Sequence, residues 1–309
     1  INTRWNPAEA VKVIKDSGAS YFIAREHSGK LCFSQLRDIL ENDGVTINRV
    51  ILCDPDESGR SDFDKIAVAD TDTELEPLSG SDIAMISYTS GTTGTPKGVM
   101  LRHSDIAKIS LYTQQIWTEE NDQPFSIAPL YSAQGFLSLL INFATGSRFK
   151  MISSFNTNDI LREISKKNET IFHTQPTMWT MLLNSRAINF ADFSGLNKIV
   201  VSGSLCSPEL AKRIEERLKC DLLNAYGLIE GTSVVTMTRY GDSEEVRRNT
   251  VGRPIPGVEI KIVDENRKPV PHGEIGELAI RGYVMAGYYN NEEKTAEITD
   301  DEGWLYTGD

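Results

Sequence analysis

Apolar and polar positions follow a helical period in some parts of the chain and alternate or cluster as strands in others. Near the start, Ala10, Val13 and Ile14 recur at helical spacing and Gly18 follows them. This pattern predicts a helix over 7–17 that ends at the glycine. Short apolar runs bounded by polar residues predict strands in the first half of the chain, at 21–24, 50–53, 83–88, 99–101, 126–128 and 148–152.

Two further helices are expected in this half, one starting near Ser104, a suitable N-cap, and one buried over 136–143. The stretch 54–82 holds ten acidic residues against Arg60 and Lys65. We predict a solvated surface loop there.

From residue 158 onward, strands and helices alternate. Helices are predicted at 159–167, 176–184 and 208–219, and strands at 170–174, 198–201 and 221–225. Such alternation is typical of a largely parallel sheet with helices on its faces. After Thr250 the segments 258–263 and 277–281 alternate with period two, among frequent Gly and Pro. The sequence therefore predicts an α/β fold followed by a smaller β-rich subdomain with barrel-like curvature.

Composition narrows the class of protein. The 309 residues carry a net charge of −12, with 39% apolar and 25% charged residues. These values are ordinary for a globular protein and exclude collagen, coiled coil and wholesale disorder. The acidic balance argues against a nucleic-acid partner bound through a basic face, and no apolar run is long enough for a transmembrane helix.

The cysteines and histidines are scattered. Four isolated cysteines favour free thiols in a reducing compartment, so we expect a cytoplasmic protein. The four histidines form no metal-ligand spacing with each other or with the cysteines, which favours exposed or satisfied core histidines. The chain starts without Met and stops abruptly after Asp309, so we expect a piece of a longer protein.

The strongest chemical signal is the loop after the strand at 83–88. Its glycines let backbone N–H groups approach a ligand closely, and its hydroxyls and Lys97 add further donors. This combination suits a polyphosphate. The loop is not a Walker A motif, because Pro96 precedes Lys97 and no Ser or Thr follows.

The stretch 88–98 resembles the phosphate-loop signature of the adenylate-forming (AMP-binding) superfamily, which includes acyl-CoA synthetases, aryl-CoA ligases, luciferases and peptide-synthetase adenylation domains. Further stretches resemble family motifs and occur in the family's order: 6–18, 224–230, 251–257, 276–282 with 287–291, and 304–309. The resemblance implies an ATP-dependent carboxylic acid:CoA ligase that forms acyl-AMP and then acyl-CoA. It also implies that this chain is part of the large N-terminal domain, without the C-terminal lid domain and its catalytic lysine.

The resemblance implies a division of the chain and a set of site residues. Residues 1–82 would form part of an α/β subdomain with an acidic loop, 83–245 an α/β nucleotide- and acyl-binding region, and 246–309 the β-rich subdomain. The implied catalytic residues are Lys97, Thr92, Thr93 and Glu230, and Glu230 would also bind Mg²⁺. The implied cofactor-binding residues are Thr89, Ser90, Gly91, Thr92, Thr93, Gly94, Lys97, Gly203, Ser204, Leu205, Asn224, Ala225, Tyr226, Gly227 and Asp309. The implied substrate-pocket residues are Tyr131, Ser132, Gln134, Gly135, Gly231 and Thr232.

Within this set, the Tyr226 ring would stack on adenine, Asn224 would lie near the exocyclic amine, and Asp309 would accept from the ribose hydroxyls. Two residues depart from the family pattern. Ile229 stands where a Thr usually precedes the Glu, so a hydroxyl near the α-phosphate is missing unless Thr232 supplies it. Ser132 stands where many relatives have His, which weakens inference about the acid.

The implied small-molecule partners are a carboxylic acid, ATP and CoA. A fatty acid is the first choice of substrate, and an aryl or succinylbenzoate-type acid is the second. Two other interpretations stay open: an acyl-AMP ligase that serves a carrier protein, and a non-catalytic nucleotide-binding relative.

Overall fold

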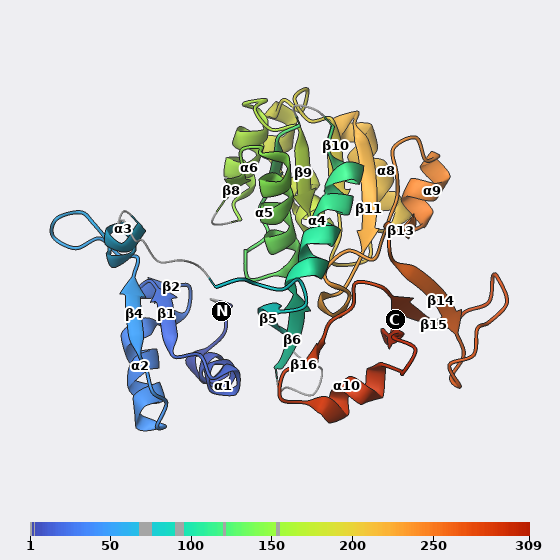
Figure 1. Ribbon diagram of the computed structural model, residues 1–309. Coiled ribbons are helices and arrows are strands. Elements are labelled where there is room, and N and C mark those ends of the chain that lie inside the picture. The colour runs from blue at the N-terminus through green and yellow to red at the C-terminus, as the bar shows by residue number, and fades with distance from the viewer. Residues whose placement is uncertain (1, 3, 68–75, 90–95, 120–121, 153–154) are drawn as a thin grey trace. The chain divides into compact units, whose positions relative to one another are not determined.

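The computed structural model describes residues 2, 4–67, 76–89, 96–119, 122–152 and 155–309 (Figure 1). The chain divides into two compact units, which we describe separately. The N-terminal unit contains 1–79 and 88–98, and the C-terminal unit contains 80–87 and 99–309. No helix among the described residues is both long enough and apolar enough to cross a membrane.

The N-terminal unit is built on two helices and a pair of parallel strands. Helix α1 (Pro7–Ser17) and helix α2 (Phe33–Asn42) share an apolar core with β1 (Tyr21–Ala24) and β4 (Arg49–Leu52). The start of α1 is closed by a capping box, in which Asn6 and Glu9 each accept from the other's backbone N–H. Its end is the αL residue Gly18, so the predicted helix is confirmed.

The predicted acidic loop is wrong at α3 (Asp62–Ala67). Here Ser61 Oγ accepts from the Asp64 N–H at 3.1 Å, while the Asp64 carboxylate accepts from the Ser61 N–H at 2.9 Å. This reciprocal pair satisfies N–H groups of the first turn, and Asp residues there suit the helix dipole. The loop prediction rested on the many acidic residues and did not consider the helix cap formed by Ser61 and Asp64. The unit also holds a short hairpin, β2 (His27–Ser28) and β3 (Leu31–Cys32).

A seven-stranded sheet forms the centre of the C-terminal unit, in the order β13-β12-β11-β10-β9-β7-β8. Five strands run parallel: β7 (Pro124–Ser126), β8 (Lys150–Met151), β9 (Ile171–Thr174), β10 (Lys198–Val201) and β11 (Asp221–Tyr226). At one end of the sheet, β12 (Thr236–Met237) pairs antiparallel with β11, and the edge strand β13 (Arg253–Pro254) pairs antiparallel with β12. The α/β fold with a largely parallel sheet is therefore confirmed.

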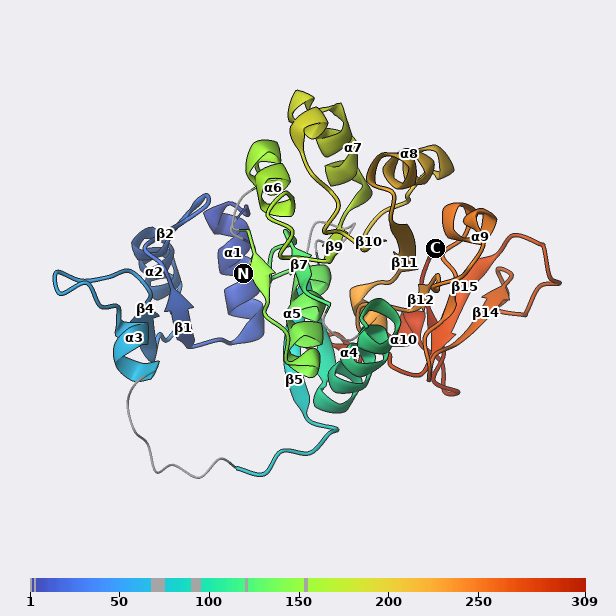
Figure 2. The ribbon, with the colours of Figure 1, turned by 90° about the horizontal axis from the view of Figure 1, so that it is seen from above.

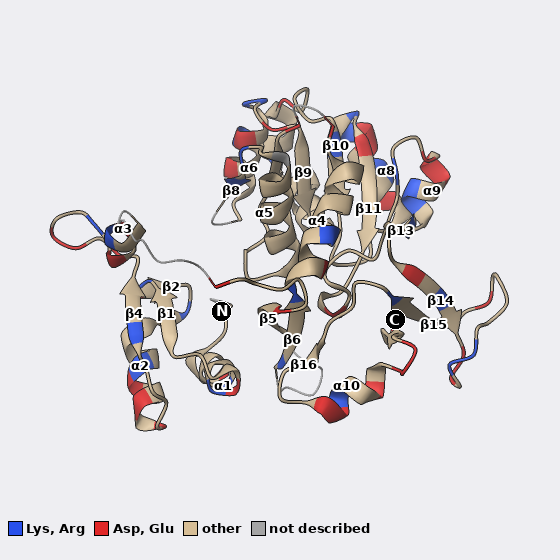
Figure 3. Cartoon of the chain, in the orientation of Figure 1, with Lys and Arg blue, Asp and Glu red and all other residues tan. Residues whose placement is uncertain are grey.

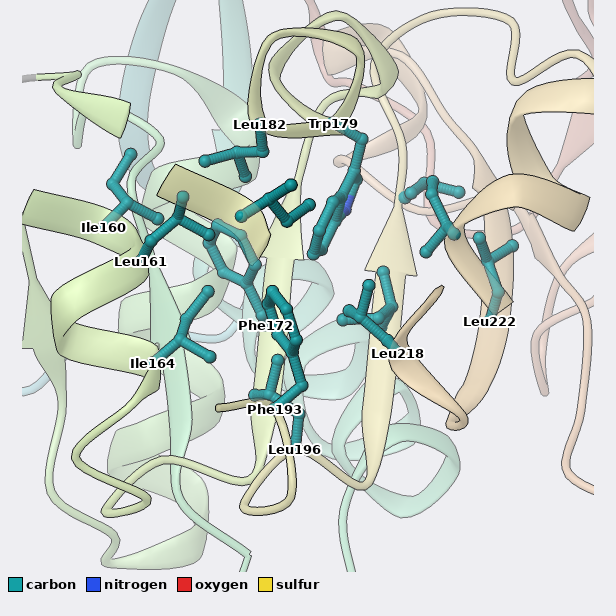
Figure 4. Packing of buried hydrophobic residues seen from close by; sticks show 14 of the residues in the cluster. Ile160, Leu161, Ile164, Phe172, Trp179, Leu182, Phe193, Leu196, Leu218 and Leu222 are labelled. Atoms are coloured by element: carbon teal, nitrogen blue, oxygen red, sulfur yellow. The ribbon is translucent and has the colours of Figure 1, made fainter. Parts of the chain in front are cut away.

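Helices cover both faces of this sheet, as the view from above shows (Figure 2). One face packs against α6 (Thr157–Ile164), α7 (Pro176–Asn184) and α8 (Pro208–Leu218), and the other against α4 (His103–Trp117) and α5 (Ala133–Thr145). Neighbouring strand residues point to opposite faces, so Phe172 packs on Trp179 of α7 (Figure 4) while Ile171 joins the α4–α5 side. Because both faces are buried, the strands are nearly continuous apolar runs.

The predicted N-cap of α4 is wrong. The helix begins at His103, with Arg102 in the cap position, and Ser104 lies within the first turn. The backbone N–H groups of His103 and Ser104 donate to the carbonyls of Asp82 and Gly80, at 3.0 and 2.9 Å. Backbone acceptors from the segment before β5 (Ile83–Thr89) thus replace a side-chain cap.

The remaining elements belong to the C-terminal unit, apart from the end of one strand at 88–89 and the start of another at 97–98, which belong to the N-terminal unit. Strands β14 (Glu259–Val263), β15 (Glu277–Arg281) and β17 (Leu305–Tyr306) form an antiparallel sheet. A second three-stranded sheet has the order β16 (Gly287–Tyr288), β6 (Lys97–Arg102) and β5 (Ile83–Thr89). The short helices are α9 (Glu244–Asn249), α10 (Glu292–Ile298) and the 3₁₀ turns η1 (Arg186–Phe190) and η2 (Ile229–Gly231). Acidic and basic residues both lie on α8, α9 and α10, whereas α5 carries neither (Figure 3).

Candidate active site

The carboxyl ends of β9, β10 and β11 lie side by side at one edge of the parallel sheet, where α/β proteins place ligands. Gln175 follows β9, Gly203 follows β10 and Gly227 follows β11. Gly203, Ser204 and Leu205 are exposed, and the Leu205 side chain is 87% exposed. The sheet order thus gathers predicted residues that are far apart in sequence.

Tyr226 and Asp309 meet at this edge. The Tyr226 hydroxyl donates to Asp309 Oδ2 at 2.5 Å, across 83 residues of sequence. Burial raises the pKa of the Tyr226 phenol, and its hydrogen bond to Asp309 raises it further, so the hydroxyl keeps its proton. Asp309 is held in turn by its carbonyl, which accepts from the Leu278 N–H at 2.9 Å. A half-buried aromatic ring therefore stands directly beside a carboxylate.

Asn224 is buried and its amide group is already engaged. Its Nδ2 donates to the Thr250 carbonyl at 3.0 Å, and its backbone N–H donates to Thr238 Oγ1 at 2.8 Å. The neighbouring Ala225 lies within β11, paired with Met237. Gly227 has to be glycine, because a Cβ there would lie 1.6 Å from the Ser233 carbonyl oxygen. This close approach folds the segment after β11 back on itself.

Glu230 lies on the turn η2. Its carboxylate Oε1 accepts from the Tyr288 hydroxyl at 2.8 Å, and its carbonyl accepts from the Met285 N–H at 2.7 Å. Burial raises the pKa of Tyr288, and the nearby Glu230 charge raises it further. One positioned, half-buried carboxylate suits Mg²⁺, which usually takes one or two protein carboxylates together with phosphate and water oxygens.

The segment after Glu230 holds an unusual backbone. Thr232 and Ser233 have positive φ angles of 53° and 96°, a region that β-branched residues seldom adopt. The Thr232 hydroxyl is buried without a hydrogen-bond partner. Two residues in this region in succession indicate local backbone strain. The sequence carried no signal for this strain.

A small apolar cavity of about 20 Å³ lies beside this segment. Its walls come from β6, α4, α5 and the η2 region, and they include Leu101, Ile109, Phe136, Leu140, Ile229 and Thr232. Ile229, which departs from the family pattern, thus lines an apolar space. The predicted pocket residue Gly231 is buried against Val235 and Ile280.

The other predicted pocket residues surround the start of α5. Ser132 is its N-cap: the hydroxyl accepts from the Gly135 N–H at 3.1 Å and donates to the Pro129 carbonyl at 2.7 Å. Gly135 has no room for a Cβ, which would lie 2.2 Å from the Pro129 carbonyl oxygen. Tyr131 is half-buried, and Gln134 is buried with neither amide atom hydrogen-bonded.

A buried histidine links this helix to the sheet. His173 of β9 lies with Nδ1 2.9 Å from Ser138 Oγ on α5, and with Nε2 2.9 Å from Ser202 Oγ after β10. Burial lowers the pKa of His173 to about 3, so the imidazole is neutral. His173 is a satisfied core histidine, as predicted. Its position between two site segments was not foreseen.

The predicted phosphate loop is described only at its ends. Ser90, Gly91, Thr92, Thr93 and Gly94 lie outside the described residues. Thr89 ends β5 and Lys97 begins β6, and both belong to the N-terminal unit. Their predicted roles stay predictions.

The N-terminal unit contains a cluster that the spacing of histidines and cysteines did not reveal. Glu26, His27 and Cys32 each have a potential metal-ligand atom within 4.8 Å of the other two. The hairpin brings them together, since His27 and Cys32 are cross-strand partners. The Cys32 thiol donates to Glu26 at 3.3 Å. Within the described part of the chain, no other group of three such residues is this close.

Comparison with known proteins decides the family. The sequence pattern of the AMP-binding enzyme family matches residues 1–289. The chain belongs to this family. It is 31% identical over 329 residues to the 3-[(3aS,4S,7aS)-7a-methyl-1,5-dioxo-octahydro-1H-inden-4-yl]propanoyl:CoA ligase of Rhodococcus jostii (strain RHA1), covering 100% of this chain and 61% of that protein.

Two other AMP-binding enzymes are also similar to the chain. It is 34% identical over 242 residues to the mitochondrial medium-chain acyl-CoA ligase ACSF2 of Rattus norvegicus, covering 75% of this chain and 39% of the relative. The anthranilate CoA ligase AuaEII, solved in complex with anthranoyl-AMP, has a TM-score of 0.89 at 26% identity, and the match covers 100% of this chain and 60% of that one. The chain therefore spans less than two thirds of these relatives' lengths, and all three are named as CoA ligases.

Proposed function

We propose that the protein containing this chain is an ATP-dependent carboxylic acid:CoA ligase. The observation that carries the proposal is the Tyr226–Asp309 pair at the carboxyl edge of the sheet, where an aromatic ring and a carboxylate match a nucleoside's base and ribose. The acid's carboxylate oxygen attacks the α-phosphorus of ATP, and pyrophosphate leaves. The CoA thiolate then attacks the acyl carbon, which forms the thioester and releases AMP.

Each site residue has a role that its chemistry supports. Tyr226 would stack on the adenine, and Asp309, which accepts one bond from Tyr226, has further lone pairs for the ribose hydroxyls. Glu230 would hold Mg²⁺, which neutralises charge on the phosphates. Lys97, Thr92 and Thr93 would donate to the phosphates, and residues 83–245 would bind the nucleotide and the acyl group.

A panel of acids tests this function in the full-length protein. ATP–pyrophosphate exchange that depends on an added acid would establish adenylation, and thioester formation on addition of CoA would establish the ligase. If exchange occurs but the acyl group is transferred only to a carrier protein, the acyl acceptor is a carrier protein and not CoA. No exchange with any acid would overturn the proposal.

A fatty acid is the proposed substrate class. The name of the rat relative, a medium-chain acyl-CoA ligase, supports this class. An aryl acid is the alternative substrate class, because the chain is also similar to the anthranilate CoA ligase.

Lys97→Ala is expected to lower ATP–pyrophosphate exchange roughly a hundredfold, the scale for losing one donor to the developing charge. The melting temperature should stay within a few degrees, because Lys97 opens β6 next to a polar loop and is not part of an apolar core. Exchange kinetics and thermal melts of the same preparation check both expectations. Unchanged exchange would remove Lys97 from the mechanism.

Thr232→Val is expected to lower exchange roughly tenfold or more. Valine keeps the β-branched shape and removes only the unpartnered hydroxyl, the group that can replace the missing Thr at position 229. Thr236→Val is a matched control, because its hydroxyl is also buried without a partner but lies on β12. Equal effects of the two variants on exchange would contradict a role for Thr232.

A further inference from the structure

Gln134 has a buried carboxamide without a protein partner. The residue is only 8% exposed, and neither its Nε2 donor nor its Oε1 acceptor makes a hydrogen bond. Leaving a buried polar atom unpaired costs about 1–3 kcal/mol, so such groups are rare in folded proteins. One residue with both a free donor and a free acceptor is therefore evidence for a missing partner.

The carboxamide lies at the carboxyl edge of the sheet. A Cβ placed on Gly203 would be 3.7 Å from Gln134 Oε1 and 3.6 Å from Gln175 Nε2. Gln134 thus reaches from α5 to the ends of β9 and β10, close to Gly203 in the segment that follows β10. This edge is where the acyl group and the adenosine have to meet.

Hydrogen bonds fix the turn of α5 that presents Gln134. The Ser138 hydroxyl donates to the Gln134 carbonyl at 2.9 Å, so its oxygen accepts from His173 Nδ1–H. His173 Nε2 then accepts from the Ser202 hydroxyl. Because the imidazole stays neutral, these bonds persist over the physiological pH range. These bonds fix the backbone of the turn that carries Gln134.

Apolar surface adjoins this polar group. Ala133, the preceding residue on α5, lines the cavity, and so do Phe136 and Leu137 in the next turn. Ser233 Oγ reaches the Ala133 carbonyl at 3.5 Å, which joins this turn to the strained Thr232 segment. Gln134 is not itself a lining residue of this cavity, so its carboxamide lies on the neighbouring face of α5.

We infer that the acid activated by this protein carries a hydroxyl group that hydrogen-bonds to the Gln134 carboxamide. A hydroxyl both donates and accepts, so it can satisfy Oε1 and Nε2, whereas an oxo group satisfies only Nε2. The substrate class is therefore a hydroxylated fatty acid. This inference rests on the proposed ligase function.

The test compares acids of one chain length in the full-length protein: the unsubstituted acid, its mid-chain and terminal hydroxy derivatives, and the oxo counterparts. We expect kcat/KM for pyrophosphate release to be at least roughly tenfold higher for one hydroxy acid than for the unsubstituted acid. In Gln134→Leu this preference should disappear, so that kcat/KM for the hydroxy acid falls to the value for the unsubstituted acid. The melting temperature should not fall, because leucine replaces an unpaired polar group.

Gln35→Leu is the matched control, since the same change on the exposed surface of α2 should leave the preference intact. Pyrophosphate release with equal or higher kcat/KM for the unsubstituted acid would overturn the inference and leave the ligase function standing. A hydroxy-acid preference that survives Gln134→Leu would also overturn it. Absence of pyrophosphate release with every acid would overturn the proposed function itself.

Discussion

Glu230→Gln in the full-length protein is expected to lower ATP–pyrophosphate exchange roughly a thousandfold. Glutamine keeps the shape of the side chain, and its Oε1 can still accept from the Tyr288 hydroxyl. Only the negative charge is lost, and with it the hard ligand that Mg²⁺ prefers. The variant should therefore fold normally, and its exchange should need a higher Mg²⁺ concentration.

Tyr288→Phe separates the charge of Glu230 from its positioning. This change removes the 2.8 Å hydrogen bond and keeps the carboxylate. A smaller loss of exchange than in Glu230→Gln is expected, because the charge remains near the phosphates. Exchange rates measured over a Mg²⁺ series check both variants. Full activity of Glu230→Gln would remove this residue from the metal site.

Asp122→Asn is expected to lower the free energy of unfolding by about 3–5 kcal/mol, the usual cost of leaving a buried charge unpaired. Asp122 Oδ2 lies 2.5 Å from Lys198 Nζ, and both side chains are almost fully buried. Asp122 also accepts from the Thr170 hydroxyl at 2.6 Å, and the Lys198 ammonium lies 4.4 Å from the centre of the Tyr240 ring. The pair joins the segment before β7 to β10.

The double variant Asp122→Asn/Lys198→Met should recover part of this loss, because it also removes the buried ammonium, whose remaining carboxylate partner is the exposed Glu119 at 3.5 Å. Glu216→Gln, in an exposed pair with Lys212, should change the free energy of unfolding very little. Urea unfolding of the three variants measures the effect. A loss in Asp122→Asn no larger than in Glu216→Gln would show that the buried pair does not stabilise the fold.

The pH dependence of stability follows from the same pair. Burial raises the pKa of Asp122, but hydrogen bonds from Lys198 and Thr170 outweigh it, and the pKa is lowered overall. A lowered carboxyl pKa adds stability above the unfolded-state value, about 3.9, and this stability is lost as the pH falls through the folded-state value. The difference between wild type and Asp122→Asn should therefore shrink in acid.

The local sequence predicted helices and strands well where the evidence was a regular spacing of apolar residues or a capping residue at a helix end. The strand at 198–201 and the helix at 176–184 have the predicted bounds, and Ser207 caps α8 as expected. The acidic-loop prediction was wrong because the local cap of Ser61 and Asp64 was overlooked, and the N-cap of α4 was wrong because its N–H groups donate to the Asp82 and Gly80 carbonyls. Such partners lie outside any short window of sequence.

The sequence by itself determined the α/β class, the alternation of strands and helices from residue 158 to 225 and the resemblance to the family, because periodicity, caps and contiguous motifs are local properties of the chain. Only the tertiary structure decided that Tyr226 bonds to Asp309, that Asp122 pairs with Lys198 and that Gln134 has no partner. These facts depend on which strands become neighbours and on what burial leaves unpaired. Strand β8, for example, lies beyond β7 at the edge of the sheet although it comes between β7 and β9 along the chain, so spacing in the sequence does not encode these contacts.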